Sequence, residues 1–169
     1  ADLGVIAAIR AAAPELPVHV STQANCLNYR AAQVYASLGV KRIVLGREMP
    51  LTDIRALRRN LPDEVELEAF VHGAMCISYS GRCLLSDYLD GRSSNRGACV
   101  QACRWKYEIR ALNPTNGETG FLPLEEDERG AYILNGKDLN MLSALGELEK
   151  VGVNSFKIEG RMKSEYYLA

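Results

Sequence analysis

The chain has 169 residues, of which 47% are hydrophobic and 24% are charged, a balance typical of a globular domain that buries one core. Its formal net charge is −1, so the overall charge does not indicate a nucleic-acid-binding protein. No apolar run approaches the roughly 18–20 residues that a membrane-spanning helix needs, and no signal peptide is visible. The sequence begins inside a helical pattern and stops soon after a strand pattern, so we expect it to be part of a longer protein.

The first 76 residues alternate between helical and strand patterns. Apolar residues at helical spacing predict three helices, over residues 3–12, over about 25–38 and from Pro50 onward. Short apolar runs between them predict strands over residues 17–20, 41–45 and 65–71. The links between these elements are short, which favours parallel strands wrapped by helices.

The last part of the chain returns to this pattern after a different kind of segment. Residues 132–134 are a strand candidate, Asp138 is expected to cap a helix, and residues 154–158 form the final predicted strand. Residues 77–104, in contrast, are rich in Gly, Ser, Arg and Cys without clear periodicity, and residues 105–124 predict a hairpin. We therefore divide the chain into βα units over 1–76, a cysteine-rich insertion with a hairpin over 77–131 and a further βα unit over 132–169.

Four of the five cysteines lie close together, with the spacing C-x6-C-x15-C-x3-C, at Cys76, Cys83, Cys99 and Cys103. Disulfides would suit a secreted protein, which nothing else in the sequence indicates. A structural zinc site usually has two tighter cysteine pairs, whereas an iron–sulfur cluster accepts more varied spacing. The spacing alone leaves zinc and a cluster open. The fifth cysteine, Cys26, falls in a predicted helix, where we expect it to be a small buried side chain.

Polar residues follow the predicted strands at their carboxyl ends, which share one face of a parallel barrel. These residues are Gln23, Arg47, Glu48, His72, Lys157, Glu159 and Arg161. Arg47 and Arg161 are suited to binding a carboxylate, and internal salt bridges are the alternative explanation for the charged residues. The insertion adds a locally basic stretch that includes Arg104, which suits an anionic partner such as a carboxylate metabolite or RNA phosphate. The same arginines would also balance the charge of an anionic thiolate cluster.

The segment around the first two cysteines resembles the signature of the peptidase U32 family. The matching positions are Glu68-x-Phe70-x2-Gly73-Ala74-Met75-Cys76-x4-Gly81-x-Cys83-x-Leu85-Ser86. Residues 21–23, 47–48 and 156–161 also resemble this family. The resemblance implies a TIM-barrel-like catalytic domain. With the βα pattern, it predicts an α/β, partial TIM-barrel-like (β/α) domain with a cysteine-rich loop and β-hairpin insertion at its C-terminal face.

The resemblance also implies a function. The family includes collagenase-type proteases, tRNA 5-hydroxyuridine synthesis proteins and oxygen-independent ubiquinone hydroxylation proteins that carry a four-cysteine iron–sulfur cluster. The cysteine-rich segment is most similar to the tRNA hydroxylation branch, which implies a cytoplasmic tRNA uridine 5-hydroxylation enzyme. The implied cofactor is a [4Fe–4S] cluster, with zinc as the alternative, bound by Cys76, Cys83, Cys99 and Cys103. The expected partners are tRNA, a small carboxylate co-substrate and a protein of the same family.

Two other functions stay open at this point, a collagenase-like peptidase and a non-catalytic iron–sulfur partner subunit. A peptidase would need a nucleophile and a base, and a pair of Cys76 and His72 would leave three cysteines without a role. For a hydroxylase, the candidate catalytic residues are His72, Lys157, Glu159 and Arg161. The candidate substrate-binding residues are Gln23, Arg47 and Arg104. A satisfied core histidine is at least as good an interpretation of His72.

Overall fold

The structure is a computed structural model that describes residues 2–76, 78–79, 83–105, 107–112, 115–117, 119–123, 138–161 and 163–168. The strand expected at residues 132–134 lies outside these ranges. Within them the chain forms a mixed α/β fold around a five-stranded sheet in which parallel pairs predominate. The α/β class predicted from the sequence is therefore confirmed. The sheet that these residues form is open and does not close into a barrel.

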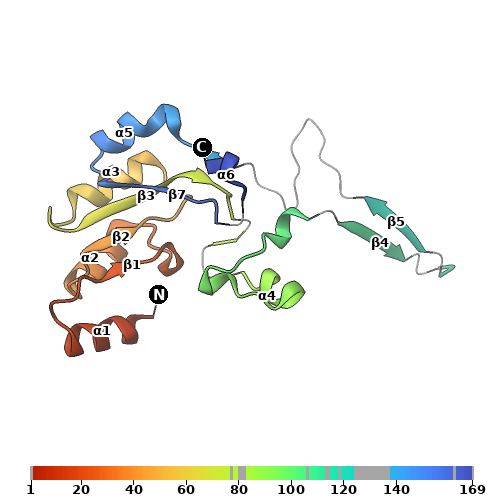
Figure 1. Cartoon of the computed structure of the whole chain (residues 1–169), viewed down its shortest axis with the longest axis horizontal. Helices are drawn as coiled ribbons and strands as arrows, with labels where there is room; N and C mark the ends of the chain where they lie inside the picture. Colours follow the sequence, from red (N-terminus) through yellow and green to blue (C-terminus); the bar gives the residue numbers. More distant parts are fainter. Residues whose placement is uncertain are drawn as a thin grey trace.

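Strand β3 (Glu66–Gly73) is the central strand of the sheet. It pairs in parallel with β2 (Arg42–Val44), which in turn pairs in parallel with β1 (His19–Val20). It also pairs in parallel with β7 (Ser155–Ile158), beside which it lies in Figure 1. At its last two residues it pairs antiparallel with β6 (Leu139–Asn140). Four strands thus run the same way, and their carboxyl ends lie at one edge of the sheet.

One face of the sheet packs against helices. The helices that supply apolar residues to this core are α1 (Leu3–Ala12), α2 (Tyr29–Ser37), α3 (Leu51–Arg59) and α5 (Leu145–Lys150). Strand β3 contributes Leu67, Ala69 and Val71, the alternate residues that share one side of a strand. Among the helices that the structure describes, none combines the length and apolar character needed to cross a membrane.

The opposite face of the sheet is polar and is organised around one carboxylate. Glu68 on β3 is buried, and its Oε2 accepts hydrogen bonds from Arg42 Nη1 on β2 and Ser155 Oγ on β7, each at 3.1 Å. Its Oε1 lies 3.3 Å from Lys157 Nζ, also on β7. A buried carboxylate requires such partners, because an unpaired charge there would be strongly destabilising. Glu68 therefore ties the three longest parallel strands together.

Helix α2 begins later than the sequence pattern predicts. The side chain of Asn28 accepts a hydrogen bond from the Ala31 amide at 2.9 Å, which makes Asn28 the N-cap. Residues Thr22–Ala24 form a separate 3-10 turn, η1, which ends at Asn25 in the left-handed conformation. Cys26 consequently lies between η1 and α2 rather than inside a helix, although it is fully buried as expected.

The segment after residue 138 also differs from its prediction. Asp138 does not cap a helix, because its carboxylate binds Arg104 and Tyr167. The next two residues extend the sheet as β6, and a 3-10 turn, η4 (Leu142–Ala144), precedes α5. A short helix, α6 (Glu165–Leu168), follows β7 and was not predicted.

The predicted hairpin is present, as β4 (Glu108–Leu112) paired antiparallel with β5 (Thr119–Pro123). It extends away from the five-stranded sheet (Figure 1). Between β3 and the hairpin the chain forms three short helical pieces, α4 (Leu85–Asp90), η2 (Ser94–Arg96) and η3 (Ala102–Arg104). We call residues 83–105, which contain these pieces and three of the cysteines, the cysteine segment.

Replacement of Leu67 by Ala is expected to lower the free energy of unfolding by about 2–5 kcal/mol, because Leu67 has no exposed surface and its loss leaves a cavity beneath the central strand. Denaturant unfolding of the full-length protein measures this. Leu142→Ala is the matched control, since that side chain is 75% exposed and its loss should change the stability by no more than about 0.5 kcal/mol. Equal effects of the two substitutions would contradict this account of the core.

Candidate functional site

Strand β3 ends at Gly73, which opens the way to the first cysteine of the signature. Gly73 has a φ of +128°, a conformation that favours glycine. A Cβ atom at this position would lie 2.6 Å from the carbonyl oxygen of Glu159, so the chain beyond β7 can approach only because no side chain is there. The close approach places the residues after β3 and those after β7 against each other, at the carboxyl edge of the sheet.

A cavity of about 580 Å³ lies at this edge. Every candidate site residue from the sequence except Glu48 and His72 lines it. The lining candidates are Gln23, Arg47, Cys76, Cys83, Cys99, Cys103, Arg104, Lys157, Glu159 and Arg161. They come from the ends of β1, β2, β3 and β7 and from the cysteine segment, and the volume is within the range of small-molecule sites.

The four cysteine side chains face this cavity together. Burial raises the pKa of Cys76, and the Cys99 and Cys83 thiols raise it further, while the Arg47 guanidinium opposes the shift. Burial also raises the pKa of Cys103, with further contributions from Cys76, Cys99 and Cys83 and an opposing one from Arg104. Cys76 and Cys103 therefore lie close enough to the other cavity thiols for charge on one to disfavour charge on another, and Arg47 and Arg104 partly offset this effect.

Four thiols around one cavity fit a tetrathiolate metal or iron–sulfur centre in donor type and number. Their spacing does not yet form a coordination sphere: among the described residues, no three Cys, His, Asp or Glu side chains are grouped closely enough to hold a metal ion. The cluster and zinc alternatives from the sequence therefore stay predictions.

Arg47 is the most buried cation of the cavity. Its side chain is 8% exposed, pairs with the carboxylate of Glu159 and lies 3.7 Å above the centroid of the Phe70 ring. Its Nε is buried without a hydrogen-bond partner among the described residues. Burial lowers the pKa of Arg47, while the neighbouring Cys76 and Glu48 favour its charged form. The salt-bridge alternative considered for Glu159 is thus realised with Arg47, and Lys157 pairs with Glu68 instead.

Two serines shape the cysteine segment. Ser86 is 1% exposed; its hydroxyl donates to the Arg92 carbonyl at 2.7 Å and accepts from the Val100 amide at 3.1 Å. Ser94 donates from its hydroxyl to the Cys83 carbonyl at 2.8 Å. The sequence reasoning assigned neither serine a role, although Ser86 closes the signature. These bonds fold the segment back on itself so that its cysteines face one way.

Gln23 attaches the cysteine segment to the sheet. Its side-chain Nε2 donates to the Ser94 carbonyl at 3.1 Å, across 71 residues of sequence. The Thr22 hydroxyl beside it donates to the Leu45 carbonyl, which holds η1 against the end of β2. One donor of the Gln23 amide is therefore committed to structure, although the residue also lines the cavity.

His72 lies in a different environment from the other candidates. Its ring is 4.7 Å from that of Tyr167, and its Nε2 is 3.1 Å from the Tyr167 carbonyl oxygen. The Tyr167 hydroxyl donates to Asp138 at 2.5 Å, and Asp138 pairs with Arg104 at the cavity wall. Burial, together with the hydrogen bond to Asp138, raises the pKa of Tyr167 to about 12. This network joins α6 to the cysteine segment, and within the described ranges no contact links His72 to Cys76.

Comparison with known proteins agrees with the signature. The model of peptidase family U32 matches residues 1–169. The chain belongs to this family. No solved structure matches it.

Among curated relatives of this U32 chain, tRNA hydroxylation protein P of Helicobacter pylori (strain J99) is 50% identical over 98% of the chain and 39% of the relative. The protein of the same name from Escherichia coli (strain K12) is 39% identical over 99% of the chain and 45% of the relative. A collagenase of Porphyromonas gingivalis is 34% identical over 89% of the chain and 36% of the relative. The chain thus spans less than half of the length of each of these relatives.

The fifth cysteine provides a pH-dependent test of the core. Burial raises the pKa of Cys26 from 9.0 to about 11, so the folded state keeps its proton at pH values where the unfolded state loses it. The resulting stabilisation is present below pH 9 and is lost between pH 9 and pH 11, with an upper limit of roughly 2–3 kcal/mol. The measurement is denaturant unfolding of wild type and Cys26→Ala across this range.

The difference in unfolding free energy between wild type and Cys26→Ala should shrink as the pH rises from 9 to 11. Subtraction removes the contribution of other groups that titrate there, and the cavity left by the missing sulfur does not depend on pH. A constant difference would show that the Cys26 thiol ionises equally in both states.

Proposed function

We propose that the protein hydroxylates uridine in tRNA at carbon 5. The observation that carries this proposal is the meeting of four thiols and several cations in one cavity at the carboxyl edge of a parallel sheet. The names of the Helicobacter and Escherichia relatives support tRNA as the substrate and hydroxylation as the reaction. A tRNA substrate also favours action in the cytoplasm.

The proposed cofactor is a [4Fe–4S] cluster held by Cys76, Cys83, Cys99 and Cys103. Such a cluster would supply one-electron redox chemistry next to the bound base. A zinc ion on the same thiols would be redox-inert, so the oxidation of a pyrimidine ring favours iron. Around it, Arg47 and Arg104 would balance the negative charge of thiolate ligands, since both guanidinium groups already counter the raised pKa of their nearest thiol.

We further propose that Arg47 binds the carboxylate of a small co-substrate. Its guanidinium is buried, is oriented by stacking on Phe70 and has an unpartnered Nε within the described part of the chain. Gln23 and Arg104 complete the candidate substrate contacts. Lys157 and Glu159 lie on β7 and directly after it. They are candidates for proton transfer because both line the cavity and are partly exposed.

The open sheet is proposed to be an arc of a TIM-like barrel whose other strands lie in the remainder of the longer protein. Helices cover one face of the sheet, as the outer ring of helices does in such a barrel. The cavity lies where barrel enzymes carry their sites, at the carboxyl ends of the strands. The proposed protein partner of the assembled enzyme is a member of the same family.

A peptidase is the second candidate, because one relative is named a collagenase. The contacts of His72 speak against it. A catalytic histidine must reach its nucleophile, whereas the His72 ring packs on Tyr167 and its Nε2 faces the Tyr167 carbonyl.

Replacement of Cys99 by Ala in the full-length protein is expected to abolish 5-hydroxyuridine in tRNA and to remove most of the iron and acid-labile sulfide, because one cluster ligand is missing. Nucleoside mass spectrometry of tRNA from complemented deletion cells and metal analysis of anaerobically purified protein provide the readouts. Cys26→Ala is the matched control: it removes a buried thiol outside the cavity and should preserve modification and iron. Full modification with Cys99→Ala would refute the cluster assignment.

Replacement of His72 by Ala distinguishes hydroxylase from peptidase. A hydroxylase whose His72 supports structure alone should retain tRNA modification, with lower thermal stability from the lost contact with Tyr167. Hydrolysis of denatured collagen by wild type that disappears in His72→Ala would instead establish the peptidase. The assays use the same protein preparations, so loss of folded protein is recognised in both.

A further inference from the structure

Two arginines stand together at the rim of the cavity. Arg96 ends the 3-10 turn η2 of the cysteine segment, and Arg161 follows β7. Both line the cavity and both are exposed to solvent. They come from opposite walls, one from the cysteine segment and one from the sheet.

Gly97 brings the two guanidinium-bearing residues to one place. Arg161 Nη1 donates to the Gly97 carbonyl, and Gly97 follows Arg96 directly in sequence. A Cβ atom on Gly97 would lie 2.5 Å from Arg161 Nη1, and its φ of +75° also favours glycine. Arg161 therefore packs on the residue next to Arg96 only because this position has no side chain.

Neither of these arginines has an acidic partner within the described residues, where Arg42, Arg47, Arg58 and Arg104 all form ion pairs. The nearby carboxylate of Glu159 is taken by Arg47. Positive charge at the rim without a counter-charge favours the binding of an anion there. The rim is thus built to receive negative charge from outside.

We propose that Arg96 and Arg161 form a clamp for the RNA backbone, one phosphate at each guanidinium, at the mouth through which the target nucleotide enters. This inference rests on the proposed function. An enzyme that acts on a base takes it out of the stack, so the backbone stays at the rim while the base enters the cavity. Exposed arginines suit phosphates that remain in solvent, whereas the buried Arg47 suits a small enclosed anion.

The test is direct binding of an unmodified RNA hairpin with a uridine in its loop to the full-length protein, by fluorescence anisotropy at several salt concentrations. Arg96→Gln and Arg161→Gln should each raise the Kd about tenfold, as expected for a lost charged hydrogen bond. Each should also reduce the slope of log Kd against log salt by about 0.7, the contribution of one single-strand phosphate contact. Arg96→Lys keeps the charge and should keep the salt slope.

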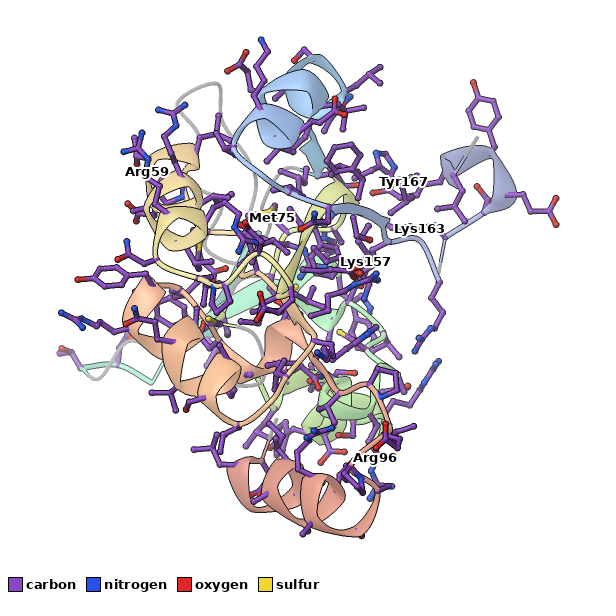
Figure 2. All side chains as sticks on the ribbon, turned by 90° about the vertical axis from the view of Figure 1, so that its left-hand side faces the viewer. Arg59, Met75, Arg96, Lys157, Lys163 and Tyr167 are labelled. Atoms are coloured by element: carbon purple, nitrogen blue, oxygen red, sulfur yellow. The ribbon has the colours of Figure 1, made fainter. Side chains whose placement is uncertain are left out.

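Arg59→Gln is the matched control. Arg59 is an exposed arginine at the end of α3, far from Arg96 in the side-chain view of Figure 2, and its loss should leave Kd and salt slope unchanged. Melting temperatures confirm that the variants fold. The Arg96 side chain makes no hydrogen bond or ion pair among the described residues, so Arg96→Gln decides the question even if Arg161→Gln is unstable.

The binding assay involves no turnover, so the clamp proposal and the hydroxylase proposal can be refuted separately. RNA binding that weakens in the rim variants without any hydroxylation in cells would retain the clamp and refute the proposed reaction. Hydroxylation that depends on Cys99, with wild-type RNA affinity in Arg96→Gln, would retain the reaction and overturn the clamp. An equal rise of the Kd in Arg59→Gln would also overturn the clamp, since the effect would then be one of net charge.

Discussion

The alternation of side chains along β3 is the constraint on which the other features depend. Its odd-numbered residues, from Leu67 to Val71, enter the core beneath the helices, while Glu68 and Phe70 face the polar side. A strand buried on both faces can carry a carboxylate only where neighbouring strands supply cations, and β2 and β7 do so. The same face then leads to Phe70, on which Arg47 stacks, and to the cavity. The hydrophobic core and the candidate site therefore lie on opposite faces of β3.

The site combines cysteine thiols with arginine guanidinium groups. From the interior of the cavity to its rim, the arginines differ in their burial and in their partners. Arg47 is buried and oriented by an aromatic ring and a carboxylate, so it can discriminate between small ligands. Arg104 is held by Asp138 beside Cys103. Arg96 and Arg161 are exposed and have no acidic partner among the described residues. A gradient of this kind suits a long anionic substrate of which only one unit enters the cavity.

The sequence pattern predicted α1, the β4–β5 hairpin and the parallel strands, because long periodic segments carry their own signal. It missed β6 and α6, which are two and four residues long and depend on contacts with β3 and His72. The cavity residues were found from sequence because carboxyl ends of parallel strands share an edge. The position of His72 outside the cavity lining could not be predicted from the sequence, because the pairing of β3 with β7 shifts register between Phe70 and His72. The pairing of Arg47 with Glu159 likewise depends on the tertiary structure and could not be predicted from the sequence.

The hydrogen bonds of the cysteine segment imply an order of assembly. The bonds made by Ser86 and Ser94 within the segment close loops of 6, 11 and 14 residues. The bonds that attach the segment to the rest, made by Gln23, Arg161 and Arg104, span 71, 64, 34 and 29 residues. Short loops cost less chain entropy to close than long ones, so the segment can adopt its turn before it docks. Its attachments, being few and long-range, are the first to break in partial unfolding. Three of the four cavity cysteines thus lie on a unit whose local turn can form before it packs against the sheet, whereas Cys76 follows the end of β3.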